Sequence, residues 1–183
     1  VKIESIGPIV GDELKTNARN AILFAMILIG IYITFRFDSY YALGSLIALI
    51  HDVAITFTGL IFFQYEISIS IIAALLTIVG YSLNDTIVIY DRIRENLKII
   101  TNVDRKIIVN KSLNITLNRT IITSLTTLIV ACVLFVMGGN ILRPFSMALI
   151  IGVITGTYSS LFIASPMMLI LENKYKLEDL EEK

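Results

Sequence analysis

Two carboxylates lie inside long apolar runs of this chain, where a charged side chain is costly. Asp52 follows His51 near the middle of one run, and Asp85 lies in the stretch "GYSLNDTIVIYDRIREN" toward the end of the next. Placing an aspartate at the centre of a membrane helix costs about 2.5–3.5 kcal/mol on insertion scales. Either the carboxylate is a structural hydrogen-bonding group or its change of protonation is used. Both alternatives stay open for Asp52.

Further polar side chains share a helical face with Asp85. The spacing places Thr77 and Tyr81 on its face and Asn84 beside it. A second polar stripe opens the segment "NRTIITSLTTL", and its members recur at intervals of three and four residues: Thr120, Thr123, Ser124 and Thr127. Since polar groups in a bundle need partners, we expect a polar helix-packing stripe made of Asn84, Thr123, Ser124 and Thr127.

Arg119 stands immediately before the second stripe. If the two helices are antiparallel, Arg119 and Asp85 lie at the same depth. Burial favours the protonated form of a carboxylic acid, whereas a nearby guanidinium favours the charged form, so a group balanced between them can load and release a proton. The sequence therefore predicts a proton pathway through Asp85 and Arg119, with Asp52 as a further candidate. The alternative is that Arg119 anchors its helix at the interface.

Small side chains recur at every fourth position of the last apolar run, at Ala148, Gly152, Gly156, Ser160 and Ala164. Because lipid provides no hydrophobic drive between helices, small residues allow the close approach that packing needs. We expect close helix packing at Gly152, Gly156 and Ser160, and a kink at Pro166.

Composition separates this chain from soluble domains. Of its 183 residues, 56% are hydrophobic and 16% are charged, whereas soluble domains are about 45–50% apolar and a quarter charged. The formal net charge of zero gives no case for a nucleic-acid partner. The single cysteine, Cys132, cannot form an intrachain disulfide. No phosphate-binding glycine loop, metal-ligand spacing or nucleophile–base arrangement is visible, so we predict no enzyme activity, cofactor or metal.

Five segments reach the roughly 20 apolar residues that a membrane helix needs. They are about 19–35, 40–63, 67–90, 120–138 and 145–170. Five consecutive runs of this length disfavour a soluble helix bundle. We therefore predict an all-α integral membrane protein with five transmembrane helices.

The segments between and around the spans define the expected organisation. Residues 1–17 are expected to end an external domain, with a last strand before a lead-in to the first helix. Residues 18–171 form the transmembrane domain, with one long connection at 91–119. That connection is either an interfacial helix lying on the membrane or a solvated helical loop. Residues 172–183 form a charged tail. Since most Lys and Arg residues fall on the side of 91–119 and the tail, that side is expected to be cytoplasmic.

Several long motifs together resemble the SecF family of the bacterial protein-export apparatus. They are "GYSLNDTIVIYDRIREN", "NRTIITSLTTL" and "GVITGTYSSLFIASP", and "ALIHDVAIT" and "IGPIVGDEL" fit the same family. The resemblance implies six spans with a large periplasmic domain after the first, so this chain looks like the last five spans. It also implies half of a pseudo-symmetric twelve-helix bundle, similar to resistance-nodulation-division transporters. Asp85 matches the intramembrane acid of the family, and Arg119 matches its arginine.

The resemblance further implies a function and partners. SecF proteins pair with SecD, assist the SecYEG channel and use the proton-motive force to draw preproteins across the cytoplasmic membrane. A multi-pass location in that membrane, with the N-terminus outside and the C-terminus in the cytoplasm, fits the charge distribution. Membrane lipid is the surrounding partner. Two alternatives stay open, namely a proton-coupled small-molecule efflux component and a membrane scaffold that conducts nothing.

Overall fold

Long helices account for the fold, because lipid offers backbone N–H and C=O groups no partner outside their own segment. The computed structural model describes residues 8–181, with side chains described over 16–175. Its elements are α1 (Pro8–Arg36), α2 (Ser39–Phe62), α3 (Ile69–Ile99), α4 (Arg105–Met137), α5 (Gly139–Ser159), the π-helix η1 (Ser160–Ala164) and α6 (Ser165–Glu181).

Within the described part of the chain, five helical stretches are long and apolar enough to cross a membrane. They are Thr16–Arg36, Ser39–Phe62, Ile69–Ile99, Arg105–Met137 and Gly139–Tyr175. The predicted fold class, an all-α membrane protein with five spans, is confirmed. Where the bilayer surfaces cut these helices stays a prediction, as does the division into domains. The strand expected before the first helix falls on residues 1–7, which lie outside the described residues.

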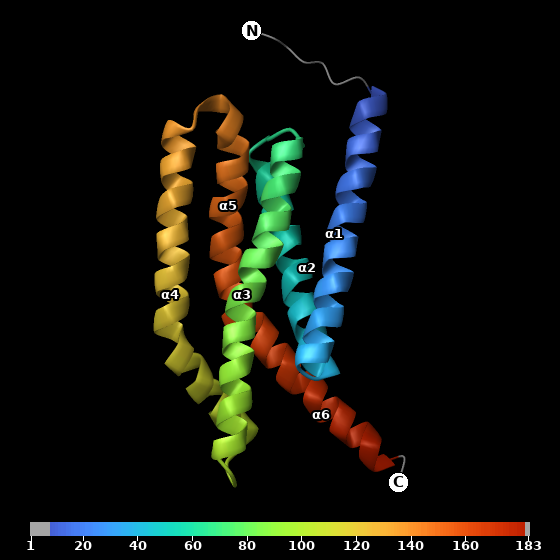
Figure 1. Cartoon of the computed structure of the whole chain (residues 1–183), viewed down its shortest axis with the longest axis vertical. Coiled ribbons are helices and arrows are strands. Elements are labelled where there is room, and N and C mark those ends of the chain that lie inside the picture. Colours follow the sequence, from blue (N-terminus) through green and yellow to red (C-terminus); the bar gives the residue numbers. More distant parts are fainter. Residues whose placement is uncertain (1–7, 182–183) are drawn as a thin grey trace.

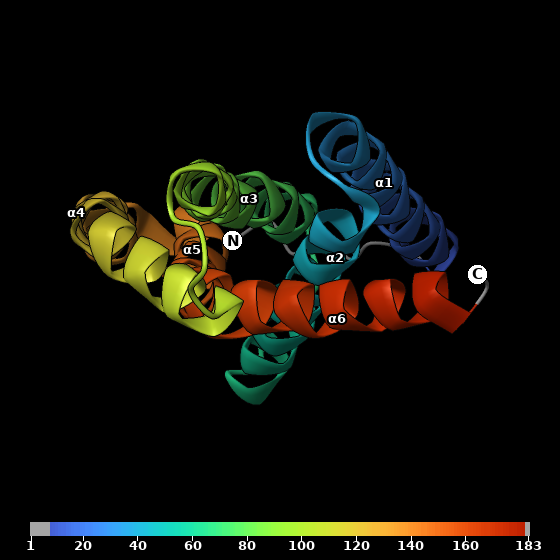
Figure 2. The ribbon, with the colours of Figure 1, turned by 90° about the horizontal axis from the view of Figure 1, so that it is seen from below.

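The five spans run antiparallel to their neighbours in the chain and form one bundle, with α6 continuing from the end of α5 (Figure 1). α5 is the central helix, since it contacts α2, α3 and α4. α1 lies at the edge, where it touches α2 and, to a smaller extent, α3. Seen along the bundle, α6 runs across its lower end beneath α2 (Figure 2). The lower end also carries the α1–α2 and α3–α4 connections, and the upper end carries the other two (Figure 1).

The connections between helices are short, and some of their residues cap the start of the next helix. The Ser68 hydroxyl accepts a hydrogen bond of 3.4 Å from the backbone N–H of Ile71 at the start of α3. The Asp104 carboxylate accepts one of 3.0 Å from Lys106 at the start of α4. Both side chains cap backbone donors that the first turn of a helix leaves free. Gly139, with φ +68°, makes the tight turn into α5 that a side chain would strain.

The segment 91–119, which we expected to be one long connection, is divided between the ends of two helices and a short link. α3 continues to Ile99 and α4 begins at Arg105, which leaves only 100–104 between them. Hydropathy falls at Asp91 because the helix acquires charges there, but charged residues such as Arg, Glu and Lys are good helix formers and the helix continues. The helical character that we expected is present, as extensions of two spans.

The last span is a bent, continuous helical rod. α5 passes through η1 into α6, and the rod changes direction there (Figure 1). Pro166 has no N–H to donate and its ring crowds the preceding turn, so the backbone loosens just before it. The Ser165 hydroxyl donates a hydrogen bond of 3.4 Å to the carbonyl oxygen of Ser160, one of the groups in the loosened turn.

Candidate functional site

Asp85 lies on α3 where this helix faces α4, and only 4% of its surface is exposed. The Thr123 and Ser124 hydroxyls and the Arg119 guanidinium, all from α4, face its carboxyl group. Its Oδ2 atom nevertheless accepts no hydrogen bond from any described residue. A buried carboxylate oxygen without a partner is costly, which sets Asp85 apart from a carboxylate used only for packing.

Two members of the polar stripe on α4, Thr123 and Thr127, are satisfied within their own helix, whereas the buried Thr120 hydroxyl has no partner among the described residues. Thr123 donates to the carbonyl oxygens of Arg119 and Thr120, both at 3.0 Å, and Thr127 donates to the carbonyl oxygen of Thr123 at 3.0 Å. Ser124 instead shares a hydrogen bond of 2.7 Å with the Thr157 hydroxyl of α5. Of the expected stripe, Ser124 therefore makes the hydrogen bond that joins two helices.

Arg119 is exposed and lines a polar cavity of about 470 Å³ at the lower end of the α3–α4 contact. Val88, Asp91, Arg92, Glu95, Ile115 and Thr116 complete the lining. Among the described residues Arg119 has no carboxylate within 4.0 Å, so it forms no ion pair with Asp85. The cavity reaches to within one helical turn of Asp85, because its lining residue Val88 follows Asp85 by three positions.

Asn84 lies away from the α3–α4 contact. It is exposed, together with Thr77 and Gly80 on the same side of α3. The Tyr81 hydroxyl, one turn above Asp85, is buried and has no partner among the described residues. Helical spacing alone put Asn84 next to Asp85, but the rotation of α3 in the bundle turns its side chain outward.

Asp52 has a different environment from Asp85, because it is fully buried and well satisfied. Its Oδ2 accepts hydrogen bonds from the Ser82 hydroxyl at 2.6 Å and from the Ser159 hydroxyl at 2.7 Å. Its Oδ1 lies 3.1 Å from Nδ1 of His51. One carboxylate thus joins α2, α3 and α5. Sequence reasoning missed both serines, whose only signal was a hydroxyl at a similar depth in each run.

The small residues of α5 pack against α3, as their spacing predicts. A Cβ atom added to Gly152 would lie 2.3 Å from Cδ1 of Ile78, and one added to Gly156 would lie 3.0 Å from Cβ of Ser82. Ser160 continues the contact, since its hydroxyl shares a hydrogen bond of 2.9 Å with Thr86. The row therefore brings α5 close to the helix that carries Asp85.

Ion pairs at the lower end connect helices that sequence reasoning did not pair. Arg36 at the end of α1 lies 2.9 Å from Asp91 of α3, and both side chains are partly exposed. Arg105 at the start of α4 pairs with Glu172 of α6, which is buried. Pairing across the bundle depends on where each helix ends, which composition does not reveal.

Comparison with known proteins places this bundle in a family. Residues 1–174 match the family described as "Protein export membrane protein SecD/SecF, C-terminal". The chain belongs to this SecD/SecF family. It is 44% identical to the protein translocase subunit SecF of Sebaldella termitidis, over 100% of this chain and 59% of that protein. It is 49% identical to SecF of Rhodothermus marinus, over 93% of this chain and 58% of that protein.

A fused relative and its solved structure extend the likeness to the SecD/SecF fold. The protein translocase subunit SecDF of Thermus thermophilus is 45% identical over 96% of this chain and 24% of that protein. A crystal structure of SecDF from the same organism superposes with a TM-score of 0.86, at 46% identity, over 91% of this chain and 23% of that chain. The chain thus spans less than two thirds of the length of these SecD/SecF relatives. Family membership and the five apolar helices together make it a multi-pass membrane protein.

Proposed function

We propose that this chain is part of a membrane subunit of the protein-export machinery that couples the proton-motive force to preprotein translocation. Membership of the SecD/SecF family and the likeness to proteins named protein translocase subunits support the export role. The proposed setting is the bacterial cytoplasmic membrane, with the lower end of the bundle facing the cytoplasm. In this proposal the chain moves protons and transmits force, and it catalyses no covalent step.

The observation that carries the proton role is the state of the Asp85 carboxyl group. It is buried, faces Arg119 across the α3–α4 contact and keeps an unpartnered Oδ2. One carboxylate oxygen of Asp52, by contrast, already accepts hydrogen bonds from two hydroxyls. Asp85 has an oxygen to which a proton can be added without breaking a hydrogen bond. Its protonation can therefore change while the bundle stays folded.

The polar cavity at Arg119 supplies a route for the proton on one side. Its charged and hydroxyl groups can hold water between the lower end of the bundle and Asp85. Arg119 is unpaired among the described residues, so its long side chain can move toward or away from the carboxylate. A guanidinium that approaches favours loss of the proton, and one that withdraws favours its uptake.

The proposed partners follow from the fused relative. SecDF of Thermus thermophilus joins SecD and SecF in one chain, so SecD is the partner that we propose to complete the bundle. The SecYEG channel and preproteins in transit are the further proposed partners. The exposed side of α3 with Thr77, Gly80 and Asn84 offers small and polar groups to such a neighbour.

The test compares Asp85→Asn with wild type in the complete SecD–SecF complex, reconstituted in vesicles with a pH gradient. Asn keeps the shape and removes the titratable group, so proton conductance and gradient-driven translocation of a preprotein should both fall to background. Asp38→Asn, at an exposed aspartate before α2 whose side chain makes no capping hydrogen bond, is the matched control and should behave as wild type. If both activities persist in Asp85→Asn while the complex assembles, the chain is a scaffold and the proposal fails.

A further inference from the structure

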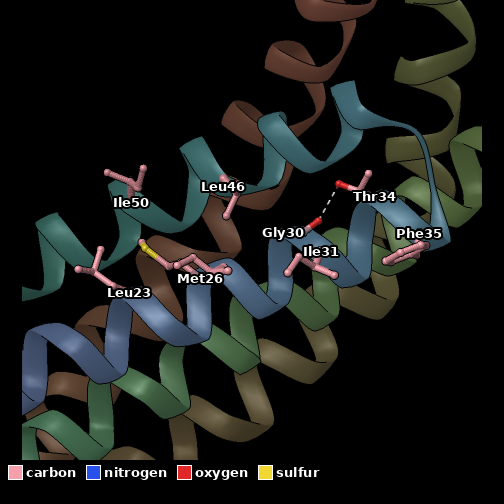
Figure 3. Close-up of a pocket in the computed structure, with 9 residues that line it drawn as sticks. Leu23, Met26, Gly30, Ile31, Thr34, Phe35, Leu46 and Ile50 are labelled. Carbon is pink, nitrogen blue, oxygen red and sulfur yellow. Dashed lines mark hydrogen bonds between the residues drawn. The ribbon is translucent and has the colours of Figure 1, made fainter.

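Two adjoining cavities follow α1 on the opposite side of the bundle from Arg119. One, of about 460 Å³, lies between α1 and α2 (Figure 3). The other, of about 530 Å³, lies between α1, α2 and the beginning of α3. Both are lined by Leu23 and Met26, so they adjoin along α1, and together we call them the α1 groove. It extends from Arg19 near the upper end to Thr34 near the lower end.

The lining of the α1 groove is almost entirely apolar. Its side chains include Leu23, Met26, Ile27, Leu46, Ile50 and Phe57. The hydroxyl of Thr34 donates a hydrogen bond of 2.8 Å to the carbonyl oxygen of Gly30, and Figure 3 shows this bond at one end of the groove. Between Arg19 at one end and Thr34 at the other, the lining side chains are apolar and offer a ligand no hydrogen-bonding group. An aliphatic chain fits this chemistry.

A second transmembrane helix fits the groove poorly. Close helix contacts in membranes need small residues, which let backbones approach, whereas bulky side chains line this groove. Gly30 is the one glycine in the lining, and Leu46 already fills its place, with Cδ1 3.2 Å from where a Cβ would lie.

The length of the groove also suits a lipid chain. Fifteen residues of helix separate Arg19 from Thr34, which corresponds to about 22 Å at 1.5 Å per residue. Half of the hydrocarbon core of a bilayer is about 15 Å thick. An acyl chain whose headgroup lies beside Arg19 can therefore stay inside the groove over its whole length.

Arg19 gives the upper end of the groove a positive charge. It is exposed and forms no ion pair within 4.0 Å among the side chains described over 16–175. A guanidinium presents several N–H donors in one plane, which match the oxygens of a phosphate group. We propose that the α1 groove binds one acyl chain of an anionic phospholipid, whose phosphate pairs with Arg19. This site is independent of the proton role proposed for Asp85.

The test counts lipids bound to the full-length protein in its complex with SecD. Native mass spectrometry after exposure to equal amounts of phosphatidylglycerol and phosphatidylcholine should show at least a five-fold preference for the anionic lipid. Arg19→Gln should abolish the preference and leave an uncharged lipid bound equally well. Met26→Trp should remove both lipids by filling the place where the two cavities meet, and Ile50→Phe is a smaller change with the same aim.

Two matched controls separate this site from general adhesion of lipid. Arg143→Gln removes an exposed arginine at the same end of the bundle, on α5, outside the groove. Ile129→Trp adds bulk to the exposed side of α4. Both variants should keep the wild-type preference. The proposal is overturned if Arg143→Gln acts like Arg19→Gln, or if folded Met26→Trp and Ile50→Phe proteins retain the anionic lipid. It is also overturned if a photo-crosslinker at Ile50 captures a polypeptide in place of lipid.

Discussion

Asp52 and Ser159 are 107 positions apart in the chain and are joined by a hydrogen bond of 2.7 Å. The same carboxylate oxygen accepts the Ser82 hydroxyl, so a single atom fixes the positions of α2, α3 and α5 relative to one another. Asp85, one turn below Ser82 on α3, has no such support for its Oδ2. Asp52 and Asp85 thus have opposite environments, because Asp52 has several hydrogen-bond donors and Oδ2 of Asp85 has none among the described residues.

The saturated environment of Asp52 predicts energetic coupling between its partners. Ser82→Ala or Ser159→Ala should each lower the free energy of unfolding by about 1 kcal/mol, the scale of hydrogen bonds between membrane helices. Asp52→Ala should cost about 1–3 kcal/mol, because it leaves the buried Ser82 hydroxyl without its acceptor, whereas the Ser159 hydroxyl keeps the carbonyl oxygen of Gly156. Unfolding in mixed micelles of SDS and a mild detergent measures these values. The double variant Asp52→Ala/Ser159→Ala should lose less stability than the sum of the losses of the two single variants. Strict additivity would show that the contact between the two side chains carries no energy.

The contact between Gly152 and Ile78 predicts a suppressible packing defect. Gly152→Ala should destabilise the protein by about 1–3 kcal/mol, because its methyl group would overlap Cδ1, Cγ1 and Cγ2 of Ile78. Ile78→Ala should cost less in the Gly152→Ala background than in wild type, because it makes room for the added methyl group. Gly80→Ala is the matched control, since a Cβ there meets nothing within 4 Å, and it should be neutral or slightly stabilising. Equal costs of Ile78→Ala in the two backgrounds would contradict the contact.

The two ion pairs at the lower end should differ in strength. Asp91→Asn should cost less than about 1 kcal/mol, because both side chains of the Arg36–Asp91 pair are partly exposed and water screens them. Arg105→Gln should cost about 2 kcal/mol, since it removes a cation from the buried Glu172. Thermal unfolding of the single variants checks the ranking. The charge swap Arg105→Glu with Glu172→Arg should restore part of the stability that Arg105→Gln loses. Equal effects of Asp91→Asn and Arg105→Gln would refute the ranking of the two ion pairs.

Cysteine labelling can test the proposed orientation directly. In a Cys132→Ala background, Thr101→Cys lies in the α3–α4 connection and Glu66→Cys in the α2–α3 connection, both at exposed positions. A maleimide that cannot cross membranes should label position 66 in intact spheroplasts and position 101 only in inverted vesicles. The reverse result would invert the bundle. The native Cys132, exposed on α4 within a helix long enough to span the membrane, should stay unlabelled in both preparations until the membrane is dissolved.

Sequence alone predicted the elements of this fold better than their relations. Apolar runs of sufficient length forecast all five spans, because the bilayer imposes length and composition on each helix separately. Hydropathy could not forecast that α3 and α4 continue to Ile99 and from Arg105, since it reports where lipid ends and not where helices end.

In the candidate site, too, some contacts could be predicted from the sequence and others could not. The pairing of Asp85 with the α4 stripe followed from spacing and from the antiparallel order of adjacent spans. The outward direction of Asn84 and the bonds from Ser82 and Ser159 to Asp52 did not, because they depend on the rotation of each helix about its own axis. That rotation is fixed by contacts among three or more helices, and one run of sequence does not contain them.

The π-helix changes the direction around the helix axis in which the later residues of the last span point. Small residues recur there every four positions, while an α-helix completes a turn in 3.6, so each step drifts by about 40°. From Ala148 to Ala164 an unbroken α-helix would carry the row about 160° around its axis, yet both ends are fully buried. The wider turn at Ser160–Ala164 rotates less per residue and offsets part of this drift. The direction in which Met168 and Glu172 point is therefore set by one extra residue in that turn. Losing this residue would turn α6 by about 100°, away from the helices that it now joins.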